Sequence, residues 1–518
     1  MIPLATLKAT AQRALRQVSR AKDVRDAEVF ASSLGQLICR LNYTSEIPCN
    51  GVEEPKSVES FGVGVRALFQ GPDGLRLGFG SEARDLSARG VEQALEKARR
   101  GAVPDPEFVS FPAGPLPERP SSRYHDRAIM DVKDSRLVET GWKVIHEALR
   151  AFQGSEALAR LAGSKEKVPS LGLIVSGDVS LSRQRMAIAS THMPKVRADE
   201  SSLITSFVTA MVERHNAKGS GYGAASHLSG FKGEAGAEAA RNAIRGIRGQ
   251  RLPTGTYTVV LGPQPLADLM INLILPSLSA DAFYSSRSAF LGELGRPVAN
   301  PMLSIYDHGA GRGFAGSRYL TCEGLPTGRT DLIRGGVLTG LLSNHYETQR
   351  LLHDPRAREK LGVNPQEHAE ALEPRNGFRG SNMGRRSFDV PPSIAATNVF
   401  LESAAPQTPE ALYRTVGAGV YIGRIWYTYA INGLRAGDFT CTVVGDSYLI
   451  QDGRLGAPLQ ANTVRMTGNI RQLLRGVIGV TRQARPILGW SNDEVIYAPE
   501  MAVREIQLNE IAQFMQAV

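Results

Sequence analysis

A histidine followed by a glutamate is the residue pair with the most specific chemistry in this sequence. Two histidines on one helix face can hold a zinc ion, and a glutamate beside the first can activate a water molecule for hydrolysis. The one such pair is His146-Glu147, and a second histidine would be needed at position 150 or 151, where the sequence has Arg150 and Ala151. We therefore predict that this pair is an ordinary dipeptide on the surface of a helix.

Residues 311–316, GRGFAG, match the glycine spacing of dinucleotide-binding loops. Such a loop needs a helix directly after it, because the N-terminus of that helix receives the pyrophosphate. Residues 317–324, SRYLTCEG, predict a strand instead, so we interpret the glycines as turn residues. The sequence also has no GxxxxGKS/T motif for nucleoside triphosphates and no GxSxG motif for a serine nucleophile.

Histidine and cysteine, the other side chains that commonly bind metals, are scattered along the chain. None of the 9 histidines is spaced from another as a ligand pair on one helix face, so the spacing supports no metal site. The cysteines Cys39, Cys49, Cys322 and Cys441 form no CxxC pair and are too few for a disulfide framework. Cys322 and Cys441 have strand-like surroundings, which favours packed thiols over nucleophiles, and the set fits a reducing compartment.

Periodic patterns indicate the elements of the first half. Apolar residues recur at helical spacing over 4–18, and 26–33 predicts a strand that this helix covers. Residues 61–82 predict a hairpin whose turn is Gly71-Pro72-Asp73-Gly74. The remaining predicted segments are, in order, a helix at 86–100, a Pro-rich connector at 103–122, a helix at 134–152, strands at 170–191 and 201–215, a flexible glycine-rich loop at 218–230, and a helix at 234–249.

The second half begins with a buried strand at 252–262 and continues with an apolar segment at 266–283. Leu266, Leu269, Met270, Leu273 and Ile274 recur at three- and four-residue spacing, which predicts a buried helix. Many short strands separated by glycine turns follow, without regular alternation of strand and helix. We therefore predict an α+β protein with mixed sheets and flanking helices, in two domains that comprise residues 1–248 and 249–518.

Composition excludes several kinds of partner. The net charge of +9, from 60 basic and 51 acidic residues, is spread thinly, and its densest runs, 245–251 and 379–386, contain no interleaved aromatic residues. We therefore predict that both runs are solvated surface and that the protein has no nucleic-acid partner. The apolar segment is interrupted by Asp268, Asn272 and Pro276, so we predict no membrane span. The basic N-terminus has a helical stripe that leads into a strand and no apolar secretory core, which predicts a cytoplasmic protein.

Several segments together resemble the TldD/PmbA family of metallopeptidases. The resemblance continues in the first half, in DAEVFAS, FGVGVRAL and the glycine-rich run before residue 230, and so covers nearly the whole chain. It implies a two-domain TldD/PmbA-like fold. The segments of the second half that carry it are 255–263 (GTYTVVLGP), 322–342 (CEGLPTGRTDLIRGGVLTGLL), 383–388 (MGRRSF), the region of Asn398, 433–455 and 463–480.

The same resemblance locates the zinc site of the family. In its TldD subunits the helix after the VVLG-like strand carries an HExxxH motif, and alignment of FLGELGRPVAN places INLILP over those six positions. Ile271 and Pro276 then occupy the two histidine positions, and Asn272 the glutamate position. The third ligand of the family is a cysteine near the C-terminus, and residues 489–503 contain none. Neither Ile nor Pro can bind zinc, and Asn cannot act as a general base.

This pattern is similar to the TldE (PmbA) type of subunit, which lacks the zinc motif. The resemblance implies that this chain is the non-catalytic partner of a TldD-like zinc peptidase, in a heterodimer or homodimer that acts on unfolded or precursor peptides. Zinc is then expected only in the TldD-like partner, and this chain binds no cofactor. Two alternatives stay open: an active peptidase with unorthodox ligands such as His215, His227 or His345, and a stand-alone peptide-binding or regulatory module. Residues 351–378 are longer than the usual connection of the family, and Cys322 stands where the family more often has Asp.

Three charged residues of the family-like segments lie beside glycines that let a peptide backbone approach closely. They are Glu323 and Arg329 in CEGLPTGR and Asp438 in GDF. A peptide that binds as an added strand at the edge of a sheet draws its affinity from main-chain hydrogen bonds, and nearby charges fix its register. We hypothesise that these residues line a peptide chamber or a subunit interface. The alternative is that Glu323 and Asp438 pair with arginines to hold turns.

Overall fold

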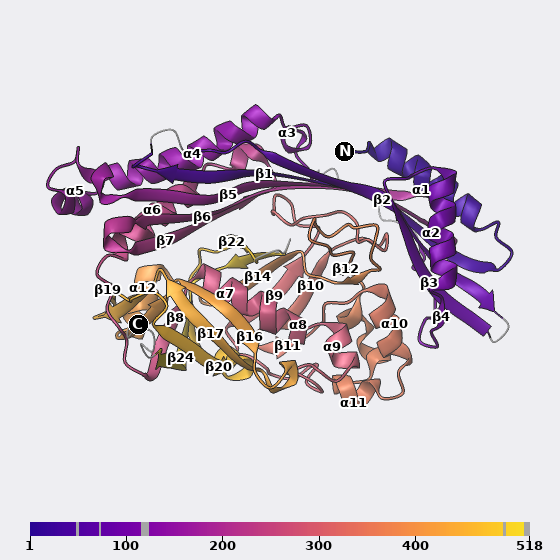
Figure 1. The fold of residues 1–518 in the computed structure, drawn as a ribbon. Helices are drawn as coiled ribbons and strands as arrows, with labels where there is room; N and C mark the ends of the chain where they lie inside the picture. Colours follow the sequence, from indigo (N-terminus) through magenta and orange to yellow (C-terminus); the bar gives the residue numbers. More distant parts are fainter. Residues whose placement is uncertain (48–50, 72–73, 115–123, 490–493, 512–518) are drawn as a thin grey trace, which may run out of the picture.

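Long antiparallel strands form a seven-stranded sheet in the first half of the chain. The computed structural model describes residues 1–47, 51–71, 74–114, 124–489 and 494–511. The sheet has the order β4-β3-β2-β1-β5-β6-β7, and it arches over the rest of the molecule (Figure 1). Its strands are β1 (Val24–Thr44), β2 (Lys56–Gly71), β3 (Gly74–Ala83), β4 (Val103–Pro104), β5 (Leu173–Ser190), β6 (Arg197–Val212) and β7 (Ala217–Ala225).

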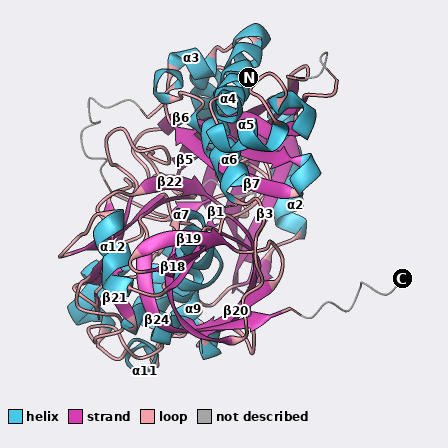
Figure 2. Cartoon of the chain, turned by 90° about the vertical axis from the view of Figure 1, so that its left-hand side faces the viewer, coloured by secondary structure: helices cyan, strands magenta, loops and turns pink. Residues whose placement is uncertain are grey.

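Helices cover the outer face of this sheet, as their apolar stripes predict. The first helix buries Leu7, Ala11, Ala14 and Val18 against it, which confirms the predicted helix over 4–18. Helices α4 to α6 lie on one side of β5 to β7, and the strands of the second half lie on the other side (Figure 2). The helices are α1 (Leu4–Val18), α2 (Ala88–Arg100), α3 (Arg127–Met130), α4 (Asp134–Gln153), α5 (Glu156–Ala162) and α6 (Glu234–Arg245).

The predicted flexible loop at 218–230 is wrong, because residues 217–225 form the edge strand β7. Its glycines allow helix α6 to lie directly on the strand. A Cβ at Gly219 would be 2.1 Å from the backbone nitrogen of Ala243, and one at Gly221 would be 1.9 Å from the carbonyl oxygen of Ala235. These glycines therefore record close packing and not flexibility.

Two large sheets and the two-stranded β12-β13 sheet form the second half. The six-stranded sheet has the order β11-β10-β9-β14-β23-β22, and the nine-stranded sheet the order β16-β17-β20-β24-β8-β15-β18-β19, with β21 beside β24. Parallel pairs, β14 with β23 and β8 with β15, occur among antiparallel ones, which confirms the predicted α+β class with mixed sheets. The strands are β8 (Gly255–Leu261), β9 (Leu303–His308), β10 (Arg329–Arg334), β11 (Val337–Leu338), β12 (Gly377–Phe378), β13 (Ser393–Ile394), β14 (Asn398–Ser403), β15 (Gly419–Ile422), β16 (Arg424–Ala430), β17 (Asp438–Gly445), β18 (Tyr448–Gln451), β19 (Arg454–Pro458), β20 (Val464–Asn469), β21 (Val477–Val480), β22 (Arg485–Leu488), β23 (Val495–Ala498) and β24 (Met501–Glu510).

The predicted boundary near residue 249 lies in the segment that joins α6 to β8. Every strand of the first sheet ends by residue 225, and every strand of the two larger sheets starts at residue 255 or later. The division into domains 1–248 and 249–518 stays a prediction. Among the described residues, no helix combines the length and the hydropathy that crossing a membrane requires.

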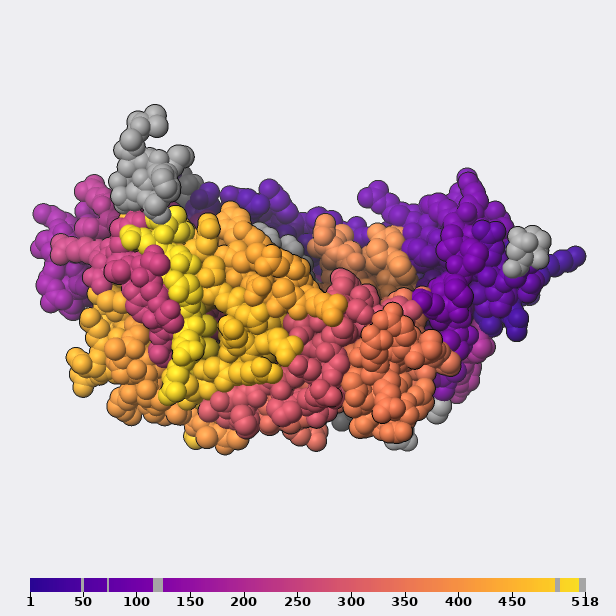
Figure 3. Space-filling view, turned by 90° about the horizontal axis from the view of Figure 1, so that it is seen from below, coloured from indigo at the N-terminus to yellow at the C-terminus, as the bar shows by residue number. Residues whose placement is uncertain are grey.

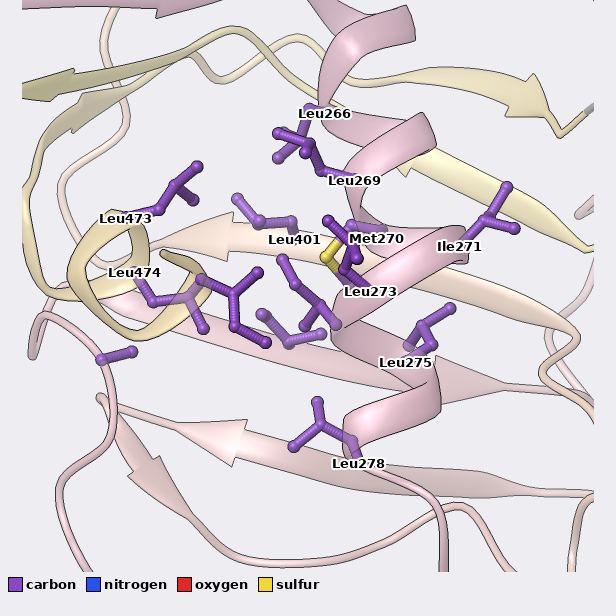
Figure 4. Packing of buried hydrophobic residues seen from close by; sticks show 14 of the residues in the cluster. Leu266, Leu269, Met270, Ile271, Leu273, Leu275, Leu278, Leu401, Leu473 and Leu474 are labelled. Atoms are coloured by element: carbon purple, nitrogen blue, oxygen red, sulfur yellow. The ribbon is translucent and has the colours of Figure 1, made fainter. Parts of the chain in front are cut away.

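A buried helical segment forms the centre of the second half, as the spacing of its leucines predicts. It consists of α7 (Pro263–Leu269), the π turn η4 (Met270–Ile274) and α8 (Leu275–Ser277). Leu266, Leu269 and Leu273 point toward Leu401 and Leu473 of the core (Figure 4). The other helices of this half are α9 (Ala280–Tyr284), α10 (His345–His353), α11 (Ala357–Leu361), the 3-10 segment η5 (Pro365–Leu372), α12 (Pro409–Val416) and α13 (Ile470–Arg475).

The segment 317–324 is a turn, so the strand predicted there is wrong. The hydroxyl of Thr321 accepts hydrogen bonds from the backbone nitrogens of Glu323 (3.3 Å) and Leu325 (3.1 Å), and Gly324 has a φ of +76°. These local bonds compete with strand pairing. The interpretation of 311–316 as a turn is confirmed by Gly313, whose φ is +77°.

The connection at 351–378, which is longer than usual for the family, is mostly helical. Helices α10 and α11 and the segment η5 fold together into a lobe at one end of the second half, shown in orange at the lower right of Figure 3. This explains the length of the connection, because its apolar residues Leu351, Leu361 and Leu372 join the main core.

Four predicted features fall partly outside the described residues. Cys49 lies there, as do Pro72-Asp73 of the predicted hairpin turn, part of the Pro-rich connector and part of the C-terminal segment without a cysteine. The flanking strands β2 and β3 pair up to Gly71 and Gly74, so the hairpin itself is confirmed. The three described cysteines are free and buried, in agreement with packed thiols.

Two buried ion pairs join the first sheet to the second half. Arg379 donates to Glu28 of β1 over 2.6 Å, and these side chains are 1% and 0% exposed. Arg386 donates to Asp199 of β6 over 2.5 Å, and these are 0% and 1% exposed. Both arginines belong to the basic run 379–386, which the charge pattern predicted as solvated surface. That prediction is wrong for these two residues, because distant carboxylates compensate their burial.

Candidate functional site

The helix on which the resemblance places the zinc motif of the family contains a π turn, η4. On a regular α-helix, residues five apart point about 140° away from each other. The π turn η4 is wider, and it brings Ile271 and Pro276 to one cavity of about 210 Å³. Pro276 contributes to this turn, because its ring excludes the regular position of the carbonyl four residues earlier and it has no N–H to donate. Ile271 and Pro276, which we predict to align with the two histidines of the TldD-like motif, therefore share one cavity.

The residues of this cavity do not fit a zinc ion. Ile271 and Pro276 present hydrocarbon, and the amide of the exposed Asn272 donates to the carbonyl oxygen of Asp268 (2.9 Å). Two carboxylates line the cavity, and each is paired with an arginine: Asp281 with Arg287 (3.1 Å) and Glu494 with Arg385 (3.2 Å). Among the described residues, no group of three or more His, Cys, Asp or Glu side chains is arranged to hold a metal ion.

A second and larger cavity, of about 410 Å³, lies beside α7, the N-terminal part of this helical segment, and we call it the groove. Its floor contains Ala267 and Asp268 of α7, and its roof is the inner face of the first sheet. The groove is thus formed where the arched sheet faces the second half (Figure 1). Its lining residues are Gln36, Ile38, Asp178, Ser180, Leu181, Ser182, Leu203, Thr205, Ser206, Phe207, Tyr222, Gly223, Gln264, Ala267, Asp268, Ser381, Asn382, Met383, Trp426, Pro486, Ile487, Leu488 and Gly489.

Three edge strands border the groove, and two of them are capped by side chains. At β7, the nitrogen of Tyr222 donates to Glu238 (3.2 Å) and its oxygen accepts from Arg485 (3.3 Å). At β16, Gln264 accepts from the nitrogen of Ile425 (2.9 Å) and donates to its oxygen (3.3 Å).

The third edge strand, β22, has an open edge. Within the described part of the chain, no side chain forms a hydrogen bond with the backbone of residues 486–489. An open edge can pair with an added strand. Chemically, the groove can therefore hold an extended peptide beside the helix, with main-chain hydrogen bonds from β22.

The structure places Glu323, Arg329 and Asp438 in three different surroundings. Glu323 is 1% exposed and accepts from the backbone nitrogen of His345 (2.9 Å). This burial favours a structural role over contact with a peptide. Arg329 is exposed at the start of β10, where it binds Asp331 (2.8 Å) and stacks on the ring of Tyr306 (3.7 Å).

Asp438 begins β17 and accepts a hydrogen bond from the side-chain amide of Asn469 (2.9 Å). The partner that holds this turn is therefore an amide and not the arginine of the alternative hypothesis. Neither Asp438 nor the other two residues line the groove. Their assignment to a peptide chamber or subunit interface stays a prediction.

Substitution of Glu323 by glutamine should change how stability depends on pH. Burial raises the pKa of Glu323 to about 7, so the native state binds this proton more tightly than the unfolded chain does. The native state therefore loses stability as pH rises from about 4.5 to 7. We expect Glu323→Gln to melt at a higher temperature than the wild type at pH 8, with a difference that shrinks toward pH 5. If the variant melts at a lower temperature at every pH, Arg66 and Arg379 stabilise the wild-type carboxylate of Glu323, and the prediction is wrong.

The three histidines considered as alternative ligands are not brought together. His215 and His227 lie at opposite ends of β7, and nine residues of extended strand separate them. His345 begins α10, with its ring 3.1 Å from the carbonyl oxygen of Ser110, and burial lowers its pKa to about 4. Metal binding by this set would need a large rearrangement.

Sequence reasoning missed the residues that form the groove. Asp268 was treated as an interruption of an apolar segment, and Trp426 and the edge strand β22 were not singled out. One available signal was the acidic side chain at position 268 in the middle of a core helix, since such residues are rarely buried without a reason. The meeting of β6, α7, β16 and β22 had no signal, because it depends on tertiary structure.

Comparison with known proteins agrees with the predicted family and fold. The PmbA/TldA metallopeptidase C-terminal domain matches residues 254–510, about half of the chain. A metalloprotease of Synechocystis is 28% identical over 241 residues, which are 45% of this chain and 45% of that protein. A TldD homolog of Haemophilus influenzae is 23% identical over 232 residues, which are 45% of this chain and 42% of that protein. The chain thus matches less than half the length of these relatives.

Solved structures match over nearly the whole chain. TldE from Thermococcus kodakarensis superposes with a TM-score of 0.75 at 16% identity, over 96% of this chain and 100% of that one. A Thermotoga maritima protein named as a candidate modulator of a DNA gyrase superposes with a TM-score of 0.71 at 19% identity, over 96% and 99%. At these identities the likeness establishes the fold alone. Taken with the domain match, it means that the chain belongs to the PmbA/TldD metallopeptidase family.

Proposed function

We propose that this chain is a TldE/PmbA-like, non-catalytic subunit of a cytoplasmic zinc metallopeptidase complex that acts on unfolded or precursor peptides. The observation that carries the proposal is the cavity at η4, where Ile271 and Pro276 stand together at positions that hold the two histidines in TldD-like chains. Neither side chain can bind zinc. A subunit that lacks these ligands needs a TldD-like partner to supply zinc and the chemistry.

The groove supports a peptide-holding role for this subunit. The groove is open along β22, it lies beside the helical segment that carries Ile271 and Pro276, and its apolar walls suit the side chains of unfolded segments. An extended peptide there would gain main-chain hydrogen bonds without any requirement for one sequence. The free thiols of Cys39, Cys322 and Cys441 are compatible with the reducing conditions of the cytoplasm.

The proposal predicts the behaviour of the purified chain. Alone, it should contain well under one zinc per chain by elemental analysis and should cleave no unfolded peptide substrate. Co-expressed with a TldD-like chain that carries HExxxH, it should co-purify and the pair should cleave the peptide in a chelator-sensitive way. Mass photometry of the pair distinguishes a heterodimer from separate homodimers.

Other results would decide against the proposal. One tightly held zinc per chain together with cleavage would establish an active peptidase, and loss of both in the His215→Ala, His227→Ala, His345→Ala triple variant would identify its ligands. Peptide binding with no TldD-like partner in a native pull-down would identify a stand-alone binding or regulatory module.

A further inference from the structure

The groove differs in charge from the rest of the protein. The chain carries 60 Lys and Arg against 51 Asp and Glu, yet among the described residues the groove lining includes no Lys, Arg or His. Its two charged side chains are Asp178 and Asp268, and the remainder are apolar or neutral. We propose that the groove selects extended peptide segments that carry a Lys or Arg side chain among apolar residues, and that it disfavours acidic segments. This inference rests on the peptide-holding function proposed above and specifies its substrate class.

Asp268 is the residue on which this preference depends. It lies on the floor of the groove, one turn before Asn272, and no described Lys or Arg forms an ion pair with it. Partial burial raises the pKa of Asp268, because the site removes water without supplying a countercharge. The ammonium or guanidinium group of a bound peptide would supply that charge. A carboxylate placed there would be repelled and would also lose its own hydration.

Asp178 makes a weaker contribution from the opposite wall. Its side chain is 43% exposed, and Arg40 lies 3.9 Å from it, so part of its charge is already balanced and screened by water. Asp268 is partly exposed, but no described Lys or Arg forms an ion pair with it. The two acids therefore predict a graded effect, in which loss of Asp268 changes peptide selection more than loss of Asp178.

Aromatic walls strengthen the attraction for a cation. Trp426, Phe207 and Tyr222 all line the groove, and aromatic faces attract ammonium and guanidinium groups. Two arginines close to these rings have other partners: Arg424 lies over the ring of Phe207 and donates to Ser220 (2.5 Å), and Arg485 pairs with Glu238 (2.5 Å). Neither of these arginines lines the groove, so its acidic character is not cancelled from within.

The test compares three fluorescently labelled peptides of identical extended, apolar sequence with a central Lys, Leu or Glu. Fluorescence anisotropy with the full chain should give a Kd for the Lys peptide about 5- to 10-fold lower than for the Leu peptide, and weaker binding still for the Glu peptide. Asp268→Asn should reduce the Lys preference to about 2-fold or less, and Asp268→Glu should restore it. Asp452→Asn is the matched control, because it removes one negative charge from an exposed turn outside the groove.

Two outcomes contradict the inference in different ways. If the Lys, Leu and Glu peptides bind equally well, the charge preference is wrong while the peptide-holding function stands. If none of them binds at millimolar concentration, the proposed function fails with it. Thermal melting of each variant verifies folding, and a preference that survives in folded Asp268→Asn would also overturn the role of this residue.

Discussion

Replacement of Arg386 by methionine should lower the free energy of unfolding by about 3–5 kcal/mol. Arg386 is fully buried and is the ion-pair partner of Asp199, which is 1% exposed. The backbone nitrogens of Tyr319 (2.9 Å) and Leu320 (3.2 Å) would still donate to this carboxylate, but no other described Lys or Arg forms an ion pair with it. Urea unfolding followed by circular dichroism measures the change.

The surface pair Arg329–Asp331 provides the control for this prediction. The side chain of Arg329 is 49% exposed, so Arg329→Met should cost no more than about 1 kcal/mol. The double variant Asp199→Asn with Arg386→Met should recover part of the loss, because it leaves no buried charge without a partner. If Arg386→Met and Arg329→Met unfold at the same urea concentration, the buried pair does not join the two halves as proposed.

Truncation of Leu273 to alanine should cost about 2–5 kcal/mol, whereas Asn272→Ala should change stability by less than about 0.5 kcal/mol. Leu273 is 1% exposed and packs into the core of the second half (Figure 4). Its neighbour Asn272 is exposed. The cavity left by Leu273→Ala would lie under the helix that forms the floor of the groove. Chemical denaturation of the two variants gives the comparison directly.

A similar loss in both variants of this pair would mean that the helix is held by its exposed side and not by the core. Peptide binding adds a second measurement. Asn272→Ala should leave the affinity of the groove for the Lys peptide unchanged, because Asn272 does not line it.

The sequence by itself determined the elements whose burial is periodic. The stripes of α1, α2, α4 and the 263–277 helix identify one buried face each, because a helix exposes the same side every three to four residues. The alignment of Ile271, Asn272 and Pro276 with the zinc motif stays a prediction from the resemblance, but residue types alone show that Ile and Pro cannot bind zinc, since hydrocarbon offers no ligand atom. The α+β class followed from the irregular succession of these patterns.

Tertiary structure alone decided the features that join distant segments. Gly219 and Gly221 lie in a strand on which α6 packs so closely that a side chain would not fit. Arg379 and Arg386 are buried because carboxylates 351 and 187 residues away balance their charges. The π turn that brings Ile271 and Pro276 to one cavity, and the groove between the first sheet and α7, likewise have no local pattern. The periodicity of apolar residues shows which face of a helix or strand is buried. Which segment covers that face depends on contacts between residues far apart in the chain.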